Sequence, residues 1–213
     1  MHSDFMKTTE IYNSIDFSSL EISLCGKGRK LHYKKGTKVQ PERGEVLIIL
    51  GGYMTVSRGT HDDPVLGHTF RFMPVGLLER YYSDIGLSYT AEVCVTAIQL
   101  TLKEFDLIFL HGRENTKLFC CIMNHMVATL IYAYYERNTS SRYITVRGML
   151  YRYLYKIGND SINNEGVAVF ITKRTGISRS YVYQILSDLK KGGYITMHRG
   201  KLISINRDLP DGY

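Results

Sequence analysis

The stretch "TGISRSYVYQILSDLKKGGYI", Thr175–Ile195, decides the fold of the C-terminal part of this chain. It follows "VAVFITKR", which is predicted to be a short helix that ends at Gly176. Glycine at that point readily takes the left-handed backbone conformation that a tight turn requires. Ile177 is expected to fill the angle between two helices, and Ser178 is a favourable N-cap for the second one. The sequence therefore predicts a helix-turn-helix.

The second helix of this motif has two faces of opposite character. Its apolar residues recur at steps of three and four, as expected for one buried stripe: Val182, Ile185, Leu186 and Leu189. The opposite face carries hydrogen-bond donors near the helix N-terminus, where a recognition helix meets base edges in the major groove. Arginine suits guanine by its geometry, and glutamine suits adenine. The residues predicted to bind DNA are Ser178, Arg179, Ser180, Tyr183 and Gln184, with Lys173 on a phosphate.

The residues after this helix predict a wing. "LKKGG" ends the helix with two lysines and two glycines, and "YITM" and "KLISI" are two short strands joined at residues 198–200. A two-stranded hairpin behind a recognition helix makes a winged helix, and Arg199 and Lys201 at its tip suit phosphates. An ordinary helix and hairpin in a small basic domain is the alternative.

The charge of the chain is unevenly placed. The 213 residues carry a formal net charge of +7, yet residues 1–136 hold 14 Lys/Arg against 15 Asp/Glu. Residues 137–213 hold 13 Lys/Arg and 5 Asp/Glu, a net of +8. Such asymmetry indicates a separate basic module that faces a polyanion, with double-stranded DNA as the expected partner. A solvated surface that is basic by chance is the plainer alternative.

Residues 20–110 are predicted to form short β-strands. "EVLIILGGYMTVSRG" (45–59) is rich in aliphatic residues around a Gly-Gly break. "YTAEVCVTAIQLTL" (89–102) alternates, which predicts a strand with Ala91, Val93, Val95 and Ala97 on one face. Many short strands at this spacing favour a sandwich, a jelly roll or a barrel.

Residues 113–136 are predicted to be one long helix without glycine or proline. Five residues, hereafter the seam, recur at alternating steps of three and four, as in a coiled coil: Cys120, Met123, Val127, Leu130 and Tyr134. A second stripe lies beside the seam: Phe119, Ile122, Met126, Thr129 and Ala133. One stripe would pack on the helix's own domain and the other on a partner subunit in a homodimer. A core helix buried within one chain is the equal alternative.

A second helix is expected over residues 143–158, with Val146, Leu150 and Leu154 on one side. It lies between a break at 138–142 and a polar loop at 159–166. The predicted domains are a β-strand domain (1–112), a dimerisation helix (113–136) and a DNA-binding domain (137–213).

Several classes of protein leave no signature in this sequence. No apolar run approaches the roughly 20 residues that span a bilayer, and the N-terminus lacks a basic segment before an apolar core. No nucleophile elbow, P-loop or zinc signature is found, so an enzyme, a metal site and a cofactor are not expected. A cytoplasmic protein without membrane contact is the default. Seventeen tyrosines leave a single-stranded RNA-binding module as an alternative.

The chain resembles the CRP/FNR superfamily of bacterial transcription regulators over about residues 18–207. "LIILGGYMTV" looks like the family's strand–glycine–strand hairpin, and "MPVGLLERYY" stands where its phosphate-binding cassette lies. "AIQLTLKEFDLI" looks like the last strand leading into the dimer helix, and "GISRSYVYQILSDLKKGGYI" resembles the recognition helix. The resemblance implies an α+β fold: an N-terminal β-roll of the cyclic-nucleotide-binding jelly-roll type, a long dimerisation helix and a C-terminal winged helix-turn-helix.

The C-terminal third, with "LKKGGYI" and "GKLISINRDLP", resembles more closely the IprA-like branch, which is linked to oxidative stress resistance. This resemblance implies a sequence-specific, dimeric transcription regulator that controls oxidative stress or virulence genes, with RNA polymerase as a further partner.

The same resemblance predicts a degenerate effector pocket. Cyclic-nucleotide sensors of the family carry a Gly-Glu pair, whose glutamate holds the ribose, and an Arg-Ser pair, whose arginine neutralises the cyclic phosphate. This chain has Gly76-Leu77 and Ile85-Gly86 at those places. A buried phosphate without its cationic partner is costly, so cyclic nucleotides are not expected to bind. A sensor of another small ligand stays open.

The histidines and cysteines raise further alternatives. Because Cys25 is the one cysteine near the N-terminus, an iron–sulfur cluster is not expected. Haem binding through His61 or His68 is an alternative. Cys120 and Cys121 on the predicted dimer helix would allow a redox switch, whereas two small buried apolar side chains are the plainer interpretation.

Overall fold

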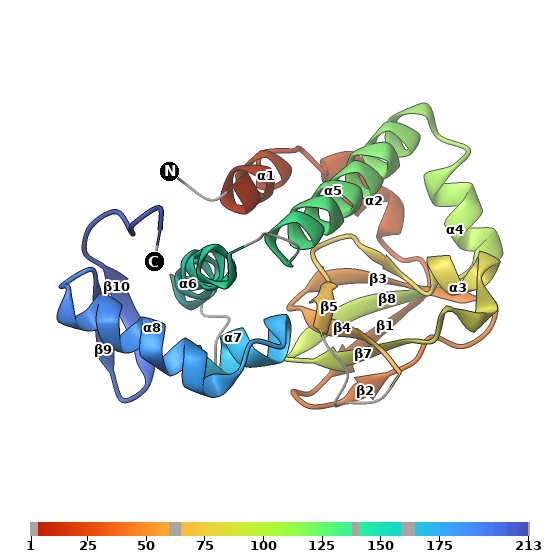
Figure 1. Ribbon diagram of the computed structural model, residues 1–213. Helices are drawn as coiled ribbons and strands as arrows, with labels where there is room; N and C mark the ends of the chain where they lie inside the picture. The colour runs from red at the N-terminus through yellow and green to blue at the C-terminus, as the bar shows by residue number, and fades with distance from the viewer. Residues whose placement is uncertain (1–3, 60–64, 138–140, 159–164, 213) are drawn as a thin grey trace. The chain divides into compact units, whose positions relative to one another are not determined.

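The structure, a computed structural model, describes residues 4–59, 65–137, 141–158 and 165–212 (Figure 1). The chain divides into two compact units. One unit comprises Glu10–Ala128, and the other comprises Met1–Thr9 with Thr129–Tyr213. The division falls within the long helix α5 (Arg113–Arg137). The domain bounds 1–112, 113–136 and 137–213 stay a prediction.

Within its described residues, the Glu10–Ala128 unit contains two four-stranded antiparallel sheets. The first has the order β1 (Arg29–Tyr33), β8 (Val95–Thr101), β3 (Glu45–Gly51) and β6 (Pro74–Val75). The second has the order β2 (Lys38–Val39), β7 (Leu87–Ala91), β4 (Met54–Arg58) and β5 (Val65–His68). Both sheets contribute to one core: Val39, Leu47, Ile49, Met54, Val56, Val75, Tyr89, Ala91, Val95 and Ala97. The predicted β-roll is confirmed.

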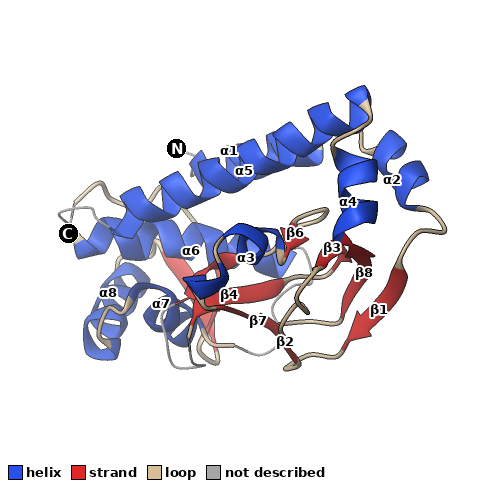
Figure 2. Cartoon of the chain, turned by 90° about the vertical axis from the view of Figure 1, so that its right-hand side faces the viewer, coloured by secondary structure: helices blue, strands red, loops and turns tan. Residues whose placement is uncertain are grey.

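The other face of the first sheet is covered by helices (Figure 2). Successive side chains of a strand point to opposite faces, so Val46 and Ile48 of β3 leave the roll interior and enter a second core. The end of α1 (Asp4–Asn13), α2 (Ser18–Leu24), α4 (Leu102–Phe109) and the first half of α5 complete that core. Burial on both faces explains why β3 reads as the unbroken apolar run "VLIIL".

The prediction of one alternating strand over residues 89–102 was wrong. β7 ends at Ala91, and β8 begins at Val95 in the other sheet, with a turn between them. Ala91, Val95 and Ala97 still reach the same core, whereas Val93 lies in the turn. The alternation persists across the turn because both strands direct apolar residues into the interior of one roll.

The helix predicted for residues 113–136 is confirmed as α5. Over Arg113–Tyr135 it is long and apolar enough to cross a membrane, judged by length and composition alone. The expectation that no segment approaches that length was therefore wrong, since apolar residues accumulate in α5 around isolated polar ones. A single helix of this kind is weak support for a membrane protein, because core helices of soluble proteins pass the same test.

The C-terminal unit packs three helices and a hairpin around one core. These elements are α6 (Arg142–Gly158), α7 (Val167–Thr175), α8 (Arg179–Lys191), β9 (Ile195–His198) and β10 (Lys201–Ile205). Val146 and Leu150 of α6 are fully buried in it, with Leu154 packed alongside, as predicted. The chain end returns to α6, where the Tyr143 hydroxyl donates to the Pro210 carbonyl at 3.0 Å. The predicted break and polar loop lie largely outside the described residues.

Candidate nucleic-acid interface

The turn between α7 and α8 forms as the sequence predicts. Gly176 takes a φ of +70°, in the left-handed region, directly after α7 ends at Thr175. The Thr175 hydroxyl donates to the Ile171 carbonyl at 2.8 Å and accepts from the Ile177 N–H at 3.2 Å, which ties both sides of the turn. Ile177 packs against the core, and Ser178 Oγ accepts from the Tyr181 N–H at 3.5 Å. The helix-turn-helix geometry is confirmed.

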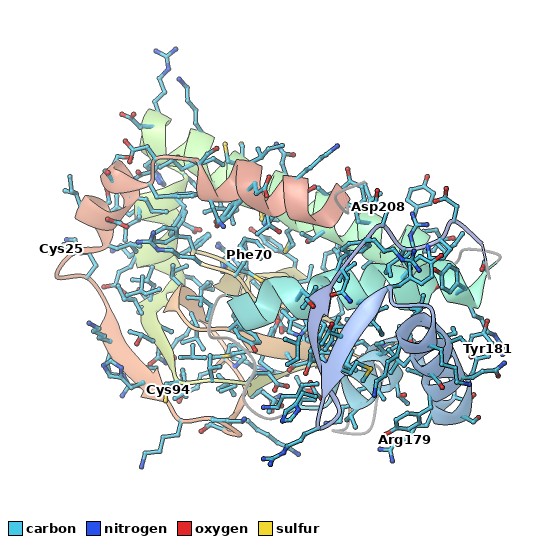
Figure 3. All side chains as sticks on the ribbon, turned by 90° about the vertical axis from the view of Figure 1, so that its left-hand side faces the viewer. Cys25, Phe70, Cys94, Arg179, Tyr181 and Asp208 are labelled. Atoms are coloured by element: carbon cyan, nitrogen blue, oxygen red, sulfur yellow. The ribbon has the colours of Figure 1, made fainter. Side chains whose placement is uncertain are left out.

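α8 has the two predicted faces, and Figure 3 labels Arg179 and Tyr181 in its first turn. Its apolar stripe is at most 3% exposed: Val182, Ile185, Leu186 and Leu189. The other face is exposed: Arg179, Ser180, Tyr183, Gln184 and Ser187. The first turn of α8 holds no acidic residue, so the positive end of the helix dipole stays uncompensated. Donor side chains and exposed backbone amides thus share one end of the helix, which favours contact with an anionic ligand.

The wing turns on two residues, Arg199 and Gly200, between β9 and β10. Both have positive φ, +46° and +77°, as a type I′ hairpin turn requires. Glycine takes this conformation freely, but arginine does so at a cost of roughly 1 kcal/mol or more. Arg199 and Gly200 are exposed, and Lys201 is partly exposed. His198 belongs to β9 and not to the turn, which is a small departure from the predicted connection.

Lys173 lies in a charged cluster that the sequence reasoning missed. It is exposed and lies 3.6 Å from Glu165 Oε1, while the buried Arg174 lies 3.1 Å from Glu165 Oε2. Arg174 also donates to the Phe170 carbonyl at 3.2 Å and stacks over the Phe170 ring at 3.9 Å. Arg174 therefore stabilises α7, whereas Lys173, within the part of the chain that the structure describes, pairs only with the carboxylate of Glu165 that it shares with Arg174. A phosphate would compete with Glu165 for Lys173.

The base of the wing is fixed by Arg207. Its guanidinium stacks on the Tyr194 ring at 4.0 Å and donates to the Gly192 carbonyl. The Asn206 N–H donates to the Tyr194 carbonyl at 2.8 Å. These contacts join the end of α8 to the end of β10, so the wing is held against the helix that it follows.

The residues of the predicted effector pocket surround α3 (Leu77–Tyr81) and the short 3-10 turn η1 (Ser83–Ile85). Gly76 precedes α3 with φ +94°, and a Cβ there would lie 2.8 Å from Pro41 and 3.0 Å from the Glu45 carbonyl oxygen. Leu77 packs against the helix-covered core, Ile85 is partly buried, and Gly86 is exposed. None of these four residues offers a charged side chain to a phosphate.

Glu79 of α3 and Tyr89 of β7 are joined by a hydrogen bond that the sequence did not predict. The Tyr89 hydroxyl donates to Glu79 Oε1 at 2.9 Å, and the Gly76 backbone contributes a further hydrogen bond to it. Burial and the Glu79 charge both raise the pKa of Tyr89 above its ordinary value, so the hydroxyl stays protonated. The backbone donor at Gly76 therefore already has a partner within the chain.

Arg80 and Asp106 join α3 to α4. The guanidinium donates to both carboxylate oxygens, at 2.6 and 2.9 Å, and this hydrogen bonding lowers the pKa of Asp106. Bidentate pairing of this kind fixes direction as well as distance. α3 is thus held on one side by β7 and on the other by α4.

The histidines and cysteines give little support to a metal or a haem. His61 lies outside the described residues, and His68 of β5 meets the Tyr53 ring edge-on at 5.7 Å. Among the described residues, no three His, Cys, Asp or Glu side chains are grouped as a metal site would need. Cys25, Cys94 and Cys120 are exposed free thiols, and Cys121 is half-buried. The interpretation of Cys120 and Cys121 as two buried apolar residues therefore does not hold for Cys120.

The two stripes of α5 lie in different environments. In the second stripe, Ile122 is fully buried and Phe119 packs against the helix-covered core. The seam is open: Val127 is 48% exposed, Leu130 52% and Tyr134 66%, with Cys120 exposed and Met123 partly so. One side of α5 thus packs within the chain and leaves the seam uncovered.

Comparison with known proteins agrees with this geometry. Residues 142–211 match a family described as winged helix-turn-helix DNA binding. A protein named inhibitor of hydrogen peroxide resistance is 56% identical to this chain over 48 residues, both in Escherichia coli K12 and in Salmonella typhimurium LT2. Those residues are 22% of this chain and 23% of each relative, so less than a quarter of either relative is matched.

Solved structures resemble nearly the whole chain. The c-di-GMP responsive global regulator CLP of Xanthomonas campestris has a TM-score of 0.65 at 13% identity, covering 90% of this chain and all of that one. A CRP/FNR-family regulator of Thermus thermophilus has 0.60 at 15% identity, covering 82% and 92%. A CooA mutant of Carboxydothermus hydrogenoformans has 0.61 at 14% identity, covering 93% and 90%. The chain therefore has the fold of CRP/FNR regulators, as its sequence resemblance implies.

Proposed function

We propose that this chain is a sequence-reading, DNA-binding transcription regulator of CRP/FNR type. The observation that carries the proposal is the exposed face of α8, where Arg179, Ser180 and Gln184 stand opposite a buried stripe. Arginine and glutamine at such positions read guanine and adenine in the major groove. The basic wing tip beside this helix suits the flanking phosphates.

The regulator acts as a homodimer through the seam of α5. An exposed apolar row on a 25-residue helix that is packed on its other side supports this assignment. Pairing two such rows would remove them from water, which favours association. The dimer then presents two recognition helices to inverted half-sites about one helical turn apart. The same pairing accounts for the apolar composition of α5 in a cytoplasmic protein.

The roll does not bind cyclic nucleotides. Leu77 and Ile85 stand in place of the glutamate and arginine of nucleotide sensors, and neither can neutralise a phosphate. Tyr89 supports the assignment further, because its hydroxyl already engages the Gly76 backbone donor and one oxygen of Glu79. The roll then serves as a fixed support for α5 or as a receptor for a smaller, uncharged ligand.

The genes under control include those that set resistance to peroxide. The support is the 56% identity over 48 residues with the inhibitor of hydrogen peroxide resistance. RNA polymerase is the further partner through which such a regulator would act.

The test is binding to duplex DNA and to single-stranded RNA at matched salt, followed by genomic footprinting with the tagged protein. We expect preference for duplex DNA and footprints over paired, inverted half-sites. A matched protein with Arg179→Ala should fold normally and give weaker footprints, with the preference at one base pair of each half-site flattened. Equal binding to single-stranded RNA would favour the RNA-binding alternative and contradict the proposal.

A further inference from the structure

One carboxylate lies within the basic surface that α7 and the wing form. Residues 165–201 hold seven Lys/Arg and two Asp/Glu, which are Glu165 and Asp188. Asp188 lies in the last turns of α8, 3.9 Å from Lys191, whereas Glu165 stands directly before the N-cap of α7. A carboxylate on a surface that binds phosphates opposes that binding, so Glu165 requires an explanation of its own.

The backbone around Glu165 is fixed on both sides. The Tyr153 hydroxyl donates to the Glu165 carbonyl at 2.7 Å. The Val167 N–H donates to the carbonyl of Gly200, in the turn of the wing, at 2.9 Å. A Cβ at Gly166 would lie 3.2 Å from the same carbonyl oxygen, so the wing turn lies directly against this segment. The carboxylate is therefore held beside the tip of the wing.

The two carboxylate oxygens of Glu165 have different partners. Oε2 lies 3.1 Å from the guanidinium of Arg174, whose side chain is 7% exposed. Oε1 lies 3.6 Å from the ammonium of Lys173, whose side chain is 58% exposed. Arg174 also has the carbonyl and the ring of Phe170 as partners. Oε1 is thus paired with a cation that a phosphate can reach from solvent.

Glu165 also has a simpler role through Oε2, because a buried guanidinium requires a counter-charge. A carboxylate before the first turn of α7 is favourable to the helix dipole as well. Neither role involves Lys173, and neither changes how DNA binding depends on salt.

The ion pair with Lys173 does change that dependence. A lysine that binds a DNA phosphate releases a counterion from the duplex. Lys173 has to leave Oε1 to do so, and the carboxylate that it leaves then attracts a cation from solution. The uptake offsets the release, so this contact adds little to the affinity or to the salt slope.

We propose that Glu165 is an internal competitor of the DNA phosphates, which pairs with Lys173 and so limits the sequence-independent part of DNA binding. The inference rests on the proposed DNA-binding function and concerns the regulation of that same surface. It lowers the affinity for random DNA, which greatly outnumbers operators in a genome. Stable binding then depends more on the bases that α8 reads.

The experiment measures binding to an operator duplex and to a random duplex of equal length, between about 50 and 200 mM salt. Glu165→Gln removes the charge and keeps an oxygen that can accept from Arg174. This variant should bind both duplexes more tightly, with a salt slope steeper by about 0.9, so its gain should be about threefold larger at the lower salt. The ratio of operator to random affinity should stay the same, because phosphates carry no sequence information.

Lys173→Gln identifies the cation that Glu165 restrains. Added to Glu165→Gln, it should abolish the gain and return the slope close to the wild-type value. In the wild-type background, the same change should alter the slope much less, because the contact is offset there. Lys173→Gln keeps the pair of Glu165 with Arg174, so it stays informative if Glu165→Gln does not fold. A loss of about 0.9 in slope from Lys173→Gln alone would then overturn the proposal.

Asp208→Asn is the matched control for charge. It removes one negative charge from an exposed position in the C-terminal tail, which Figure 3 places well away from Arg179. Its salt slope should match that of the wild type. Urea unfolding of each variant verifies that it is folded under the conditions of binding.

The outcomes separate the inference from the function on which it rests. A wild type that binds operator and random duplexes alike contradicts the proposed sequence reading, while a steeper slope for Glu165→Gln would still support the competition. If the wild type reads its operator and Glu165→Gln matches it in affinity and slope, Glu165 is a structural partner of Arg174 and the inference is wrong. A gain that survives Lys173→Gln also overturns it, because the carboxylate would then repel phosphates directly. A wild type that binds no duplex contradicts both.

Discussion

At the scale of single residues, Arg199 stands in a conformation that its type disfavours. Asparagine or glycine is the usual choice for the first position of a type I′ turn. Arginine at φ +46° is retained at the wing tip despite that cost. Backbone strain of this kind is common where a side chain serves a function. A phosphate contact is the function that its charge and its exposure suggest.

Arg199→Asn should therefore change stability and DNA affinity in opposite directions. Unfolding in urea should show a gain of up to about 1 kcal/mol, since asparagine tolerates the left-handed conformation. Affinity for all duplexes should fall, and the salt slope should drop by about 0.9 for each phosphate that the variant no longer binds. Arg199→Lys, which keeps both strain and charge, should keep affinity and gain no stability. A variant that gains stability and binds DNA like the wild type would remove Arg199 from the interface.

Arg179 and Lys201 separate base reading from phosphate binding. Arg179→Ala should cost about 1–3 kcal/mol at the operator and flatten the preference at one base pair of each half-site. Lys201→Ala should weaken all duplexes about equally and lower the salt slope by about one unit for each phosphate released from the protein. Footprinting of both variants at several salt concentrations distinguishes them. Identical losses on operator and random DNA would mean that α8 does not read sequence.

At the scale of elements, α5 is packed on one side within the chain, and its exposed seam is the dimer interface that we propose. Val127→Glu with Leu130→Glu should place four charges in an apolar dimer interface and convert the dimer to monomers. Light scattering gives the mass directly. Lys117→Glu alters the charge of α5 by the same amount at an exposed position outside the seam, and it should leave the dimer intact. A dimer that survives the double change would place the interface elsewhere.

The residues around α3 predict that cyclic nucleotides do not bind to the roll. Calorimetry with cyclic AMP or cyclic GMP should give no heat, and the melting temperature should not rise even at millimolar ligand. A ligand at 100 times its dissociation constant would stabilise the fold by about 2.7 kcal/mol, which is easily detected. A known cyclic-AMP-binding member of the family provides the positive control. A micromolar dissociation constant would show that other residues of the roll bind the phosphate in place of the missing arginine.

Elements were predictable from the sequence where their signals are local. The turn at Gly176, the cap at Ser178 and the stripe of α8 lie within about four helical turns, so short-range rules identify them. The reversal between Ala91 and Val95 was not predictable, because alternation reads the same in one strand as in two strands of one roll. The Glu79–Tyr89 bond depends on how α3 returns to β7, which no local pattern encodes.

At the scale of the whole molecule, the sequence revealed the basic C-terminal unit and concealed a basic segment of the roll, residues 26–44, which holds seven Lys/Arg and one Asp/Glu. Summing charge over residues 1–136 gives almost zero, because an acidic remainder cancels residues 26–44. Only the sheet order shows that this segment supplies an edge strand, β1 or β2, to each sheet of the roll. Charge that is averaged over a domain therefore identifies a basic module but misses a basic surface on a neutral one.

Among the described residues, the buried His125 makes the stability of the molecule sensitive to mildly acidic pH. His125 of α5 is 8% exposed, stacks on the Tyr12 ring at 4.2 Å and meets the Phe70 ring edge-on at 4.7 Å. Burial lowers the pKa of His125 to about 4, from an ordinary value near 6.5. Between pH 6.5 and about pH 4, the histidine is protonated in the unfolded chain and neutral in the folded chain. The free energy of unfolding should therefore be full above about pH 6.5 and fall as the pH drops toward 4, by up to about 3 kcal/mol.

His125→Phe keeps the stacked ring and removes the titration, so it should flatten this loss. Urea unfolding of the Glu10–Ala128 unit at about pH 7, 5.5 and 4.5 should show an advantage for the variant that grows as the pH falls. Asp16, Glu104 and Asp106 have lowered pKa values, and their stabilisation is lost only as the pH falls through the more acidic carboxylate range. Those losses occur in both proteins and cancel in the difference. Parallel pH profiles would mean that His125 accepts its proton without unfolding, and that the packing of Tyr12 and Phe70 against α5 tolerates a charge.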